Sequence, residues 1–142
     1  MKPGQEKETL LEESQARSAK SAVRFVRIAP RKVRLVIDTI RRRPVLEAFS
    51  VLMALNKKAA RLTEKVLKSA VANAKVLGMA EDRLYVSDVR ADGGPSLKRF
   101  MSRSMGRADR ILKRTTHLSI VLKEGNKKMS LPTGDAQAAD EA

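Results

Sequence analysis

Cysteine is absent from the sequence, and His117 is the only histidine. Disulfides and thiolate metal sites are therefore excluded, and the composition is consistent with a reducing compartment. A serine or threonine nucleophile needs a base within reach, and a histidine-rich metal site needs several imidazoles. We therefore predict that the protein is not an enzyme, binds no metal and needs no cofactor. His117 is expected to be a hydrogen-bonded structural residue or an RNA contact.

Aromatic residues and long apolar segments are also scarce. Three phenylalanines, one tyrosine and no tryptophan stand among the 142 residues, so we expect a mostly aliphatic core. No apolar run approaches the roughly 20 residues of a membrane-spanning helix. The first residues have neither the apolar core of a signal peptide nor the acid-poor composition of a transit peptide. We expect no membrane insertion and a cytoplasmic location.

Positive charge, by contrast, is abundant, because 30 basic and 16 acidic residues give a net charge of +14. Residues 17–123 hold 26 of the basic and eight of the acidic residues, whereas both ends of the chain are acidic overall. We predict disordered acidic extensions at 1–18 and 124–142 around one domain at 19–123. The positive surplus of this domain predicts a nucleic acid partner, with a membrane surface as the rival polyanion.

Apolar spacing predicts a strand and three helices in the first part of the chain. Residues 21–28 have the composition of a short strand, from which Arg24 and Arg27 project. Helical periodicity then predicts helices at about 30–42, 45–55 and 57–77. The packed face of the third helix is predicted to consist of Ala59, Leu62, Val66, Ala70, Ala74 and Leu77. Gly78 is expected to end this helix.

Basic residues line the outer faces of two of these helices. On the first helix, Asp38 is spaced to pair with Arg34 or Arg41, and the cluster 41–43 is predicted to lie on the last turn. On the third helix, helical spacing places one stripe of positive charge: Arg61, Lys65, Lys68 and Lys75. Such faces are usually only solvated, but in so basic a domain we favour phosphate contact.

Residues 90–117 form the most unusual segment. Between residues 93 and 116, seven basic residues stand against Asp109 as the only acid. The flanking segments 83–91 and 111–122 are rich in β-branched residues, which predicts a long two-stranded ribbon folded back near 101–106. The two glycines and the proline at 93–95 are expected to bend or bulge the strand where this arm leaves the domain. A single aromatic, Phe100, predicts RNA contact by shape and charge.

The sequence RIAPRKVRLVIDTIR, followed by NKKAARLTEKVLKSAVANA and VRADGGPSLKRFMSRSMGRADRILKRTTHLSIVL, resembles the family of bacterial large-subunit ribosomal protein number twenty-two from about residue 19 to 123. The motifs APRKVRLV and GRADRILKRTTH stand in the order and separation of that family. The resemblance implies an α+β fold in which three helices pack on a small antiparallel sheet, with a long protruding β-hairpin.

The same resemblance implies a role. The domain would lie beside the mouth of the peptide exit tunnel, and the hairpin would enter the large-subunit rRNA, line the tunnel near the macrolide site and take part in sensing the nascent peptide. The implied partners are 23S-type rRNA, neighbouring large-subunit proteins and the nascent peptide, with support of subunit assembly and no homo-oligomer. The implied tunnel-lining tip is Ser96, Leu97, Lys98, Arg99, Phe100, Met101, Ser102, Arg103, Ser104, Met105 and Gly106.

The predicted rRNA contacts combine basic residues of the domain with those of the arm. The resemblance implies Arg107, Arg110, Lys113 and Arg114 as contacts along the returning strand. The full predicted set is Arg24, Arg27, Arg31, Lys32, Arg34, Arg41, Arg42, Arg43, Lys57, Lys58, Arg61, Lys65, Lys68, Lys98, Arg99, Arg103, Arg107, Arg110, Lys113, Arg114, Thr116 and His117.

The sequence departs from the family pattern at four positions. Ala29 replaces the usual serine or threonine before the first helix, which predicts a helix start weaker by about 1 kcal/mol. Arg42 stands where a glycine commonly ends that helix. Ser102 and Met105 replace the proline and the basic residue often seen at the tip.

One alternative function remains open, an architectural DNA-binding protein that places a basic β-ribbon in a groove. Such proteins usually dimerise and insert an apolar wedge from the arm, a role that suits Phe100. No dimer surface is evident in the sequence. Affinity for duplex DNA comparable to that for rRNA would favour this alternative.

Overall fold

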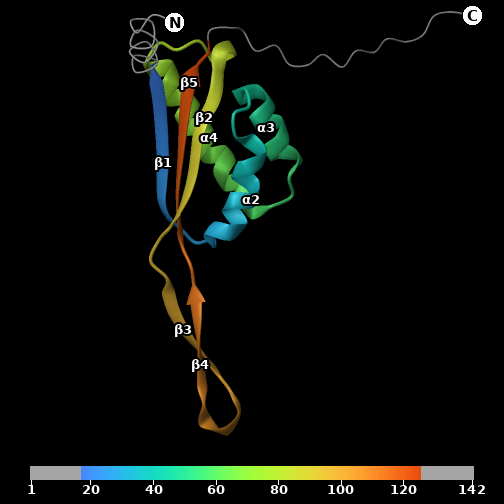
Figure 1. Cartoon of the computed structure of the whole chain (residues 1–142), viewed down its shortest axis with the longest axis vertical. Helices are drawn as coiled ribbons and strands as arrows, with labels where there is room; N and C mark the ends of the chain where they lie inside the picture. The colour runs from blue at the N-terminus through green and yellow to red at the C-terminus, as the bar shows by residue number, and fades with distance from the viewer. Residues whose placement is uncertain (1–16, 126–142) are drawn as a thin grey trace, which may run out of the picture.

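The computed structural model describes residues 17–125, which form a three-stranded antiparallel sheet, three helices on one face of it, and a long two-stranded arm (Figure 1). The sheet has the order β1-β5-β2, with β1 at Ser18–Val26, β2 at Leu84–Gly93 and β5 at Thr116–Glu124. The helices are α2 at Pro30–Ile40, α3 at Val45–Ala54 and α4 at Lys58–Val76, and the 3-10 turn η1 is at Glu81–Arg83. The arm consists of β3 at Leu97–Ser102, the 3-10 turn η2 at Ser104–Gly106 and β4 at Ala108–Lys113.

The predicted α+β fold with a protruding hairpin is therefore confirmed. The sheet begins at Ser18, three residues before the predicted strand, where Ser18 pairs with Lys123. It ends at Glu124, one residue beyond the predicted domain. The predicted disordered extensions lie almost entirely at 1–16 and 126–142, outside the described residues.

The core lies between the helices and one face of the sheet. Along β5, Leu118, Ile120 and Leu122 are buried, and the residues between them are only partly so, as expected of a sheet with one covered face. From α2, residues at helical spacing complete the core: Val33, Val36, Ile37 and Ile40. Within residues 17–125 no aromatic side chain is fully buried, which agrees with the predicted aliphatic core.

The face of α4 that packs on the sheet differs in part from the prediction. Its buried residues are Ala59, Ala60, Thr63, Val66, Leu67, Ala70 and Ala74. The predicted core residue Leu77 is exposed, because the helix has ended at Val76. Thr63 was not predicted to be buried, but its hydroxyl donates a hydrogen bond to the Ala59 carbonyl, 2.9 Å away, so no polar group is left unpaired.

The helix ends follow from the backbone of single residues. Gly78, with φ +73°, ends the turn after α4: its N–H donates to Lys75, and the Met79 N–H donates to Ala74. These two bonds form a Schellman motif, as predicted for Gly78. By contrast, α2 ends at Ile40, so the prediction that residues 41–43 form its last turn is wrong. Arg42 turns the chain out of the helix with φ +59°, and its N–H donates to the Val86 carbonyl of β2.

The start of α2 lacks a side-chain cap, and the weaker helix start expected from this stays a prediction. Ala29 occupies the N-cap, and no side chain accepts a hydrogen bond from the first turn. Pro30 is the first helical residue, where its lack of an N–H costs nothing. The backbone carbonyl of Ala29 accepts hydrogen bonds from the N–H groups of Lys32, at 3.0 Å, and Val33, at 3.4 Å.

The arm continues β2 and β5 but is offset from them by one residue. Gly93 pairs with Thr116, and the next pair is Leu97 with Lys113, so three residues of the outgoing chain oppose two of the returning chain. Gly94 remains bonded across this bulge, because its N–H donates to the Thr115 carbonyl at 2.9 Å. The predicted bend at 93–95 is therefore confirmed, and it carries the ribbon away from the domain (Figure 1).

Candidate nucleic-acid interface

A groove of about 830 Å³ opens where the arm leaves the domain, and we call it the base groove. Its walls come from three segments that are distant in the sequence: the turn into α2, the start of α4, and the base of the arm. Apolar side chains form part of its lining: Ile28, Ala29, Leu35, Ala59, Leu97 and Leu112. Leu35 remains 61% exposed, so this apolar surface lacks a cover within residues 17–125.

Seven cations surround the apolar surface of the base groove: Arg27, Lys32, Lys57, Lys58, Arg99, Lys113 and Arg114. No acidic residue lines the groove among the residues that the structure describes, and none of the seven makes an ion pair there. Like charges gathered in a concave surface raise the local concentration of anions. All seven belong to the predicted rRNA contacts, so the fold brings together residues that the sequence separates by almost 90 positions.

A second, smaller groove of about 540 Å³ continues this surface along α4. It shares Lys57 and Lys58 with the base groove and adds Arg61 and Lys65. The rest of the predicted α4 stripe is occupied within the protein: Lys68 pairs with Glu64 at 2.6 Å, and Lys75 pairs with Glu81 at 2.8 Å. The half of the stripe nearest the base groove therefore holds the cations without an internal ion pair.

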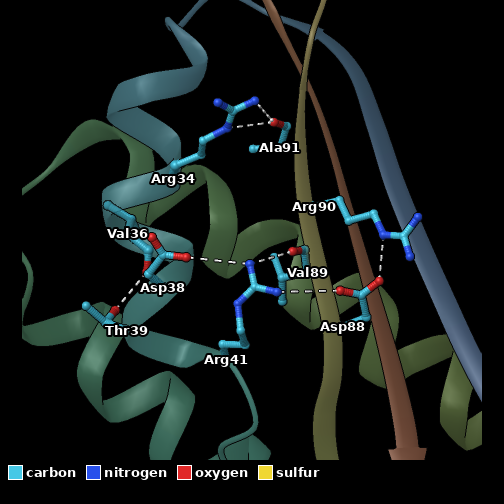
Figure 2. A network of polar contacts seen from close by, with 9 residues as sticks. All are labelled: Arg34, Val36, Asp38, Thr39, Arg41, Asp88, Val89, Arg90 and Ala91. Atoms are coloured by element: carbon cyan, nitrogen blue, oxygen red, sulfur yellow. Dashed lines mark hydrogen bonds and ion pairs between the residues drawn. The ribbon is translucent and has the colours of Figure 1, made fainter.

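Two predicted contacts, Arg34 and Arg41, fasten α2 to β2 (Figure 2). The Arg34 guanidinium donates through Nε and Nη2 to the Ala91 carbonyl, at 3.2 and 3.1 Å. Arg41 donates to the Val89 carbonyl at 3.2 Å and also pairs with Asp38 and Asp88. The hydrogen-bond donors of both arginines are therefore used to hold α2 against β2. Of the two partners that its spacing allowed, Asp38 pairs with Arg41.

Three further predicted contacts have internal partners. Arg43 forms an ion pair with Glu47, and Arg103 pairs with Asp109 at 2.7 Å. Thr116 is completely buried, and its hydroxyl donates to the Ile28 carbonyl at 2.5 Å. The prediction of Thr116 as an rRNA contact is therefore corrected: its side chain has no surface to offer.

The arm has almost no core of its own. Every residue of β3 is exposed, as is every residue of β4 except Ile111. The chain reverses at residues 103–107, where the Arg103 N–H donates to the Arg107 carbonyl and Met105 and Gly106 both have positive φ. The reversal is shorter than the predicted tip at 96–106, because Leu97 lies at the opposite end of the ribbon and lines the base groove.

Apolar side chains project from the outer part of the arm. Phe100 is 74% exposed and Met105 is 91% exposed. Arg110 stands opposite Phe100 in the ribbon, and Lys98 and Arg107 belong to the same arm; none of these three cations makes an ion pair among residues 17–125. A ribbon of this composition offers both phosphate contacts and surfaces for bases.

Comparison with known proteins places this geometry in a family. Residues 21–123 match the family described as ribosomal protein L22p/L17e. The chain belongs to this family. A protein of Caldicellulosiruptor saccharolyticus named "Large ribosomal subunit protein uL22" is 48% identical over 112 residues, which are 78% of this chain and 92% of that protein. The protein of the same name from Thermus thermophilus is 50% identical over 111 residues, 78% of this chain and 98% of that protein.

Membership of the L22p/L17e family confirms the resemblance seen in the motifs of the sequence. The family is one of structural ribosomal proteins and not of enzymes, in agreement with the single histidine. No helix among the described residues has the length and apolarity to cross a membrane.

The apolar part of the base groove was missed by the sequence reasoning. Three of its residues stand in motifs shared with the L22p/L17e family: Ile28, Leu35 and Leu112. Each is an apolar residue in a predicted helix or strand, so the sequence does not distinguish it from an ordinary core residue. Their shared surface depends on the packing of three segments, so no local pattern indicates it.

Proposed function

We propose that the protein is a structural constituent of the large ribosomal subunit that binds rRNA through the base groove and the arm. The observation that carries this proposal is the gathering of seven cations, without an acid, on one concave surface of a chain of the L22p/L17e family. The surface is too basic to be balanced within residues 17–125, and rRNA supplies the matching charge. As part of the subunit, the protein resides in the cytoplasm.

The proposed contacts are the predicted ones, with three changes. Thr116 is removed because it is buried, and Arg34 and Arg41 are assigned to the fold because β2 accepts their hydrogen bonds. The unit that performs this function is the predicted domain at 19–123 with its arm at about 90–117. Neighbouring large-subunit proteins are proposed as further partners.

The arm is proposed to pass between rRNA segments and to line the peptide exit tunnel near its turn. This assignment is supported by its exposed side chains and by its projection away from the domain (Figure 1). A ribbon that buries so little of its own surface gains its packing from a partner. The turn at 103–107 is the part that would face the nascent peptide, and ordering of rRNA around the ribbon would support subunit assembly.

A salt titration of rRNA binding tests the proposal. Each phosphate that a cation neutralises lowers the slope of log K against log salt by about 0.7–0.9. Replacing Lys57, Lys58 and Arg114 with glutamine should therefore make the slope shallower by about 2–3. Lys75→Gln is the matched control, because Lys75 already pairs with Glu81 and lies outside both grooves.

The same titration distinguishes the alternative function. Duplex DNA of matched length serves as the competitor to 23S-type rRNA. We expect rRNA to be bound more tightly at every salt concentration. Equal affinity for duplex DNA would favour the architectural DNA-binding alternative, and a triple variant with an unchanged slope would exclude the base groove from the interface.

A further inference from the structure

Phe25 combines exposure with a strained backbone. Its side chain is 60% exposed, and its φ is +57°, in the left-handed region that a phenylalanine rarely adopts. It stands at the point where the register between β1 and β5 shifts, between Val23 and Val26. A single exposed apolar residue is ordinary, but backbone strain of this kind costs about 1–3 kcal/mol and is concentrated at functional positions.

His117 holds Phe25 in this conformation. The Phe25 N–H, which the bulge removes from the strand ladder, donates to Nδ1 of His117 at 3.1 Å. The two rings meet edge to face, with centroids 4.8 Å apart and an interplanar angle of 86°. His117 is itself confined, because a Cβ on Gly94 would lie only 3.1 Å from its Nε2 atom. The ring of Phe25 is therefore positioned by the base of the arm.

The charges around Phe25, and its place on the open face of the sheet, both favour a nucleobase as the group that packs on its ring. His117 belongs to the face of β5 that the helices leave open, since its neighbours Thr116 and Leu118 are buried on the other side. Arg24 and Arg27 flank Phe25, are exposed and make no ion pair within residues 17–125. An aromatic ring between two free guanidinium groups matches a base with a phosphate on each side.

We propose that Phe25 is a stacking platform for one unpaired base of the rRNA, and that His117 is its positioning residue. The inference rests on the proposed function and names a site that the charge pattern alone does not indicate. Stacking on a hydrophobic ring releases no counterion, whereas each arginine contact does. The two kinds of contact therefore differ in their dependence on salt.

Binding of the full-length chain to deproteinised 23S-type rRNA tests the proposal over a range of salt concentrations. Phe25→Ala and Phe25→Leu should bind roughly ten- to a hundredfold more weakly with an unchanged salt slope, and Phe25→Tyr should bind within about threefold of the original. Arg24→Gln, the matched control, should make the slope shallower by about 0.7–0.9. Chemical probing should find one base that the original chain protects and Phe25→Ala leaves reactive.

Two further variants separate stacking from a purely structural role. Phe25→Gly removes the ring and the strain together, so its Tm should equal or exceed that of the original chain while rRNA binding weakens. His117→Ala should weaken binding and unprotect the same base, and His117→Asn, which keeps an acceptor near the position of Nδ1, should recover part of the loss.

The outcomes are distinct. If the original chain does not bind rRNA, the proposed function fails, and this inference fails with it. If the original chain binds and Phe25→Leu binds equally well with the same protected bases, the stacking inference alone is overturned. It is also overturned if substitution of Phe25 weakens incorporation of the chain into the large subunit only when neighbouring ribosomal proteins are present. Phe25 would then contact a protein and not a base.

Discussion

Individual basic residues of this chain divide according to whether the fold has already used their donors. Arg34 and Arg41 bond to carbonyls of β2, and Arg43 and Arg103 pair with carboxylates. The seven cations of the base groove make no ion pair among residues 17–125, although Arg99 donates one hydrogen bond to the carbonyl of its neighbour Lys98, at 2.8 Å. These unpaired cations support the proposed rRNA partner, because like charges gathered in a concave surface attract anions.

Arg42 provides a prediction about stability. Because its φ is +59°, we expect Arg42→Gly to raise the free energy of unfolding by about 1 kcal/mol. The hydrogen bond from its N–H to the Val86 carbonyl is kept by any residue except proline. Urea unfolding measures the change. Arg61→Gly, at an exposed position inside α4, is the control and should lower the same free energy by about 1 kcal/mol.

Gly94 provides a second prediction, about the root of the arm. A Cβ at this position would lie 2.5 Å from Oγ1 of Thr115, whose hydroxyl donates to the Pro95 carbonyl. Gly94→Ala should therefore lower the free energy of unfolding by about 1–3 kcal/mol. Gly93→Ala is the matched control, because nothing lies within 4 Å of its added Cβ. Equal effects of the two substitutions in urea unfolding would argue against the close approach.

The strands of the arm contribute no residue to the buried core of the domain. These strands pair only with each other, and the buried core consists of residues from the sheet and the three helices, together with Met79 in the turn after α4. Shortening the arm is therefore expected to leave the core intact. Its effect should appear where the arm meets its partner.

Removal of Leu97, Lys98 and Arg99 tests this separation. The deletion removes half of the six residues of β3. Because side chains alternate between the two faces of a strand, losing an odd number of residues also moves the side chains on one side of the deletion to the opposite face of the ribbon. We expect the macrolide response of the ribosomes to change more than the abundance of the large subunit. Growth inhibition by a macrolide, in cells whose ribosomes are shown to contain the shortened protein, measures the effect. Unchanged sensitivity would contradict the tunnel assignment.

On the scale of the whole molecule, residues 17–125 form a small aliphatic core that carries a large basic surface. A net charge of +14 and an arm without a core both need a polyanion to become favourable. Free protein and rRNA-bound protein should therefore differ mainly in the arm.

Hydrogen exchange measures this difference. In the free protein, amides of β3 and β4 should exchange much faster than those of β5, which lies at the centre of the sheet. Bound to 23S-type rRNA, the arm should gain protection by tenfold or more while β5 changes little. Slow exchange throughout the arm of the free protein would show that the ribbon is stable without RNA.

Patterns among residues close together in the sequence were enough to predict the helices and strands, the family and the arm. Apolar spacing marks α3 and α4 to within a residue at each end, and Gly78 marks a helix end, because these signals act over one or two turns. The end of α2 was predicted two residues too late, since the bond from Arg42 to Val86 joins parts of the chain that are 44 positions apart.

Composition predicted a polyanion as the partner of this chain, and two long motifs predicted the family that the comparisons confirm. Tertiary packing determined which cations remain without an internal partner. Arg34 and Arg41 donate hydrogen bonds to carbonyls of β2. Lys57 and Arg114, by contrast, line the base groove. The position of Phe25 on His117, 92 residues away, has the same origin. Helix and strand spacing record a residue's own element, but a shared surface depends on how distant elements pack, and that information is not local.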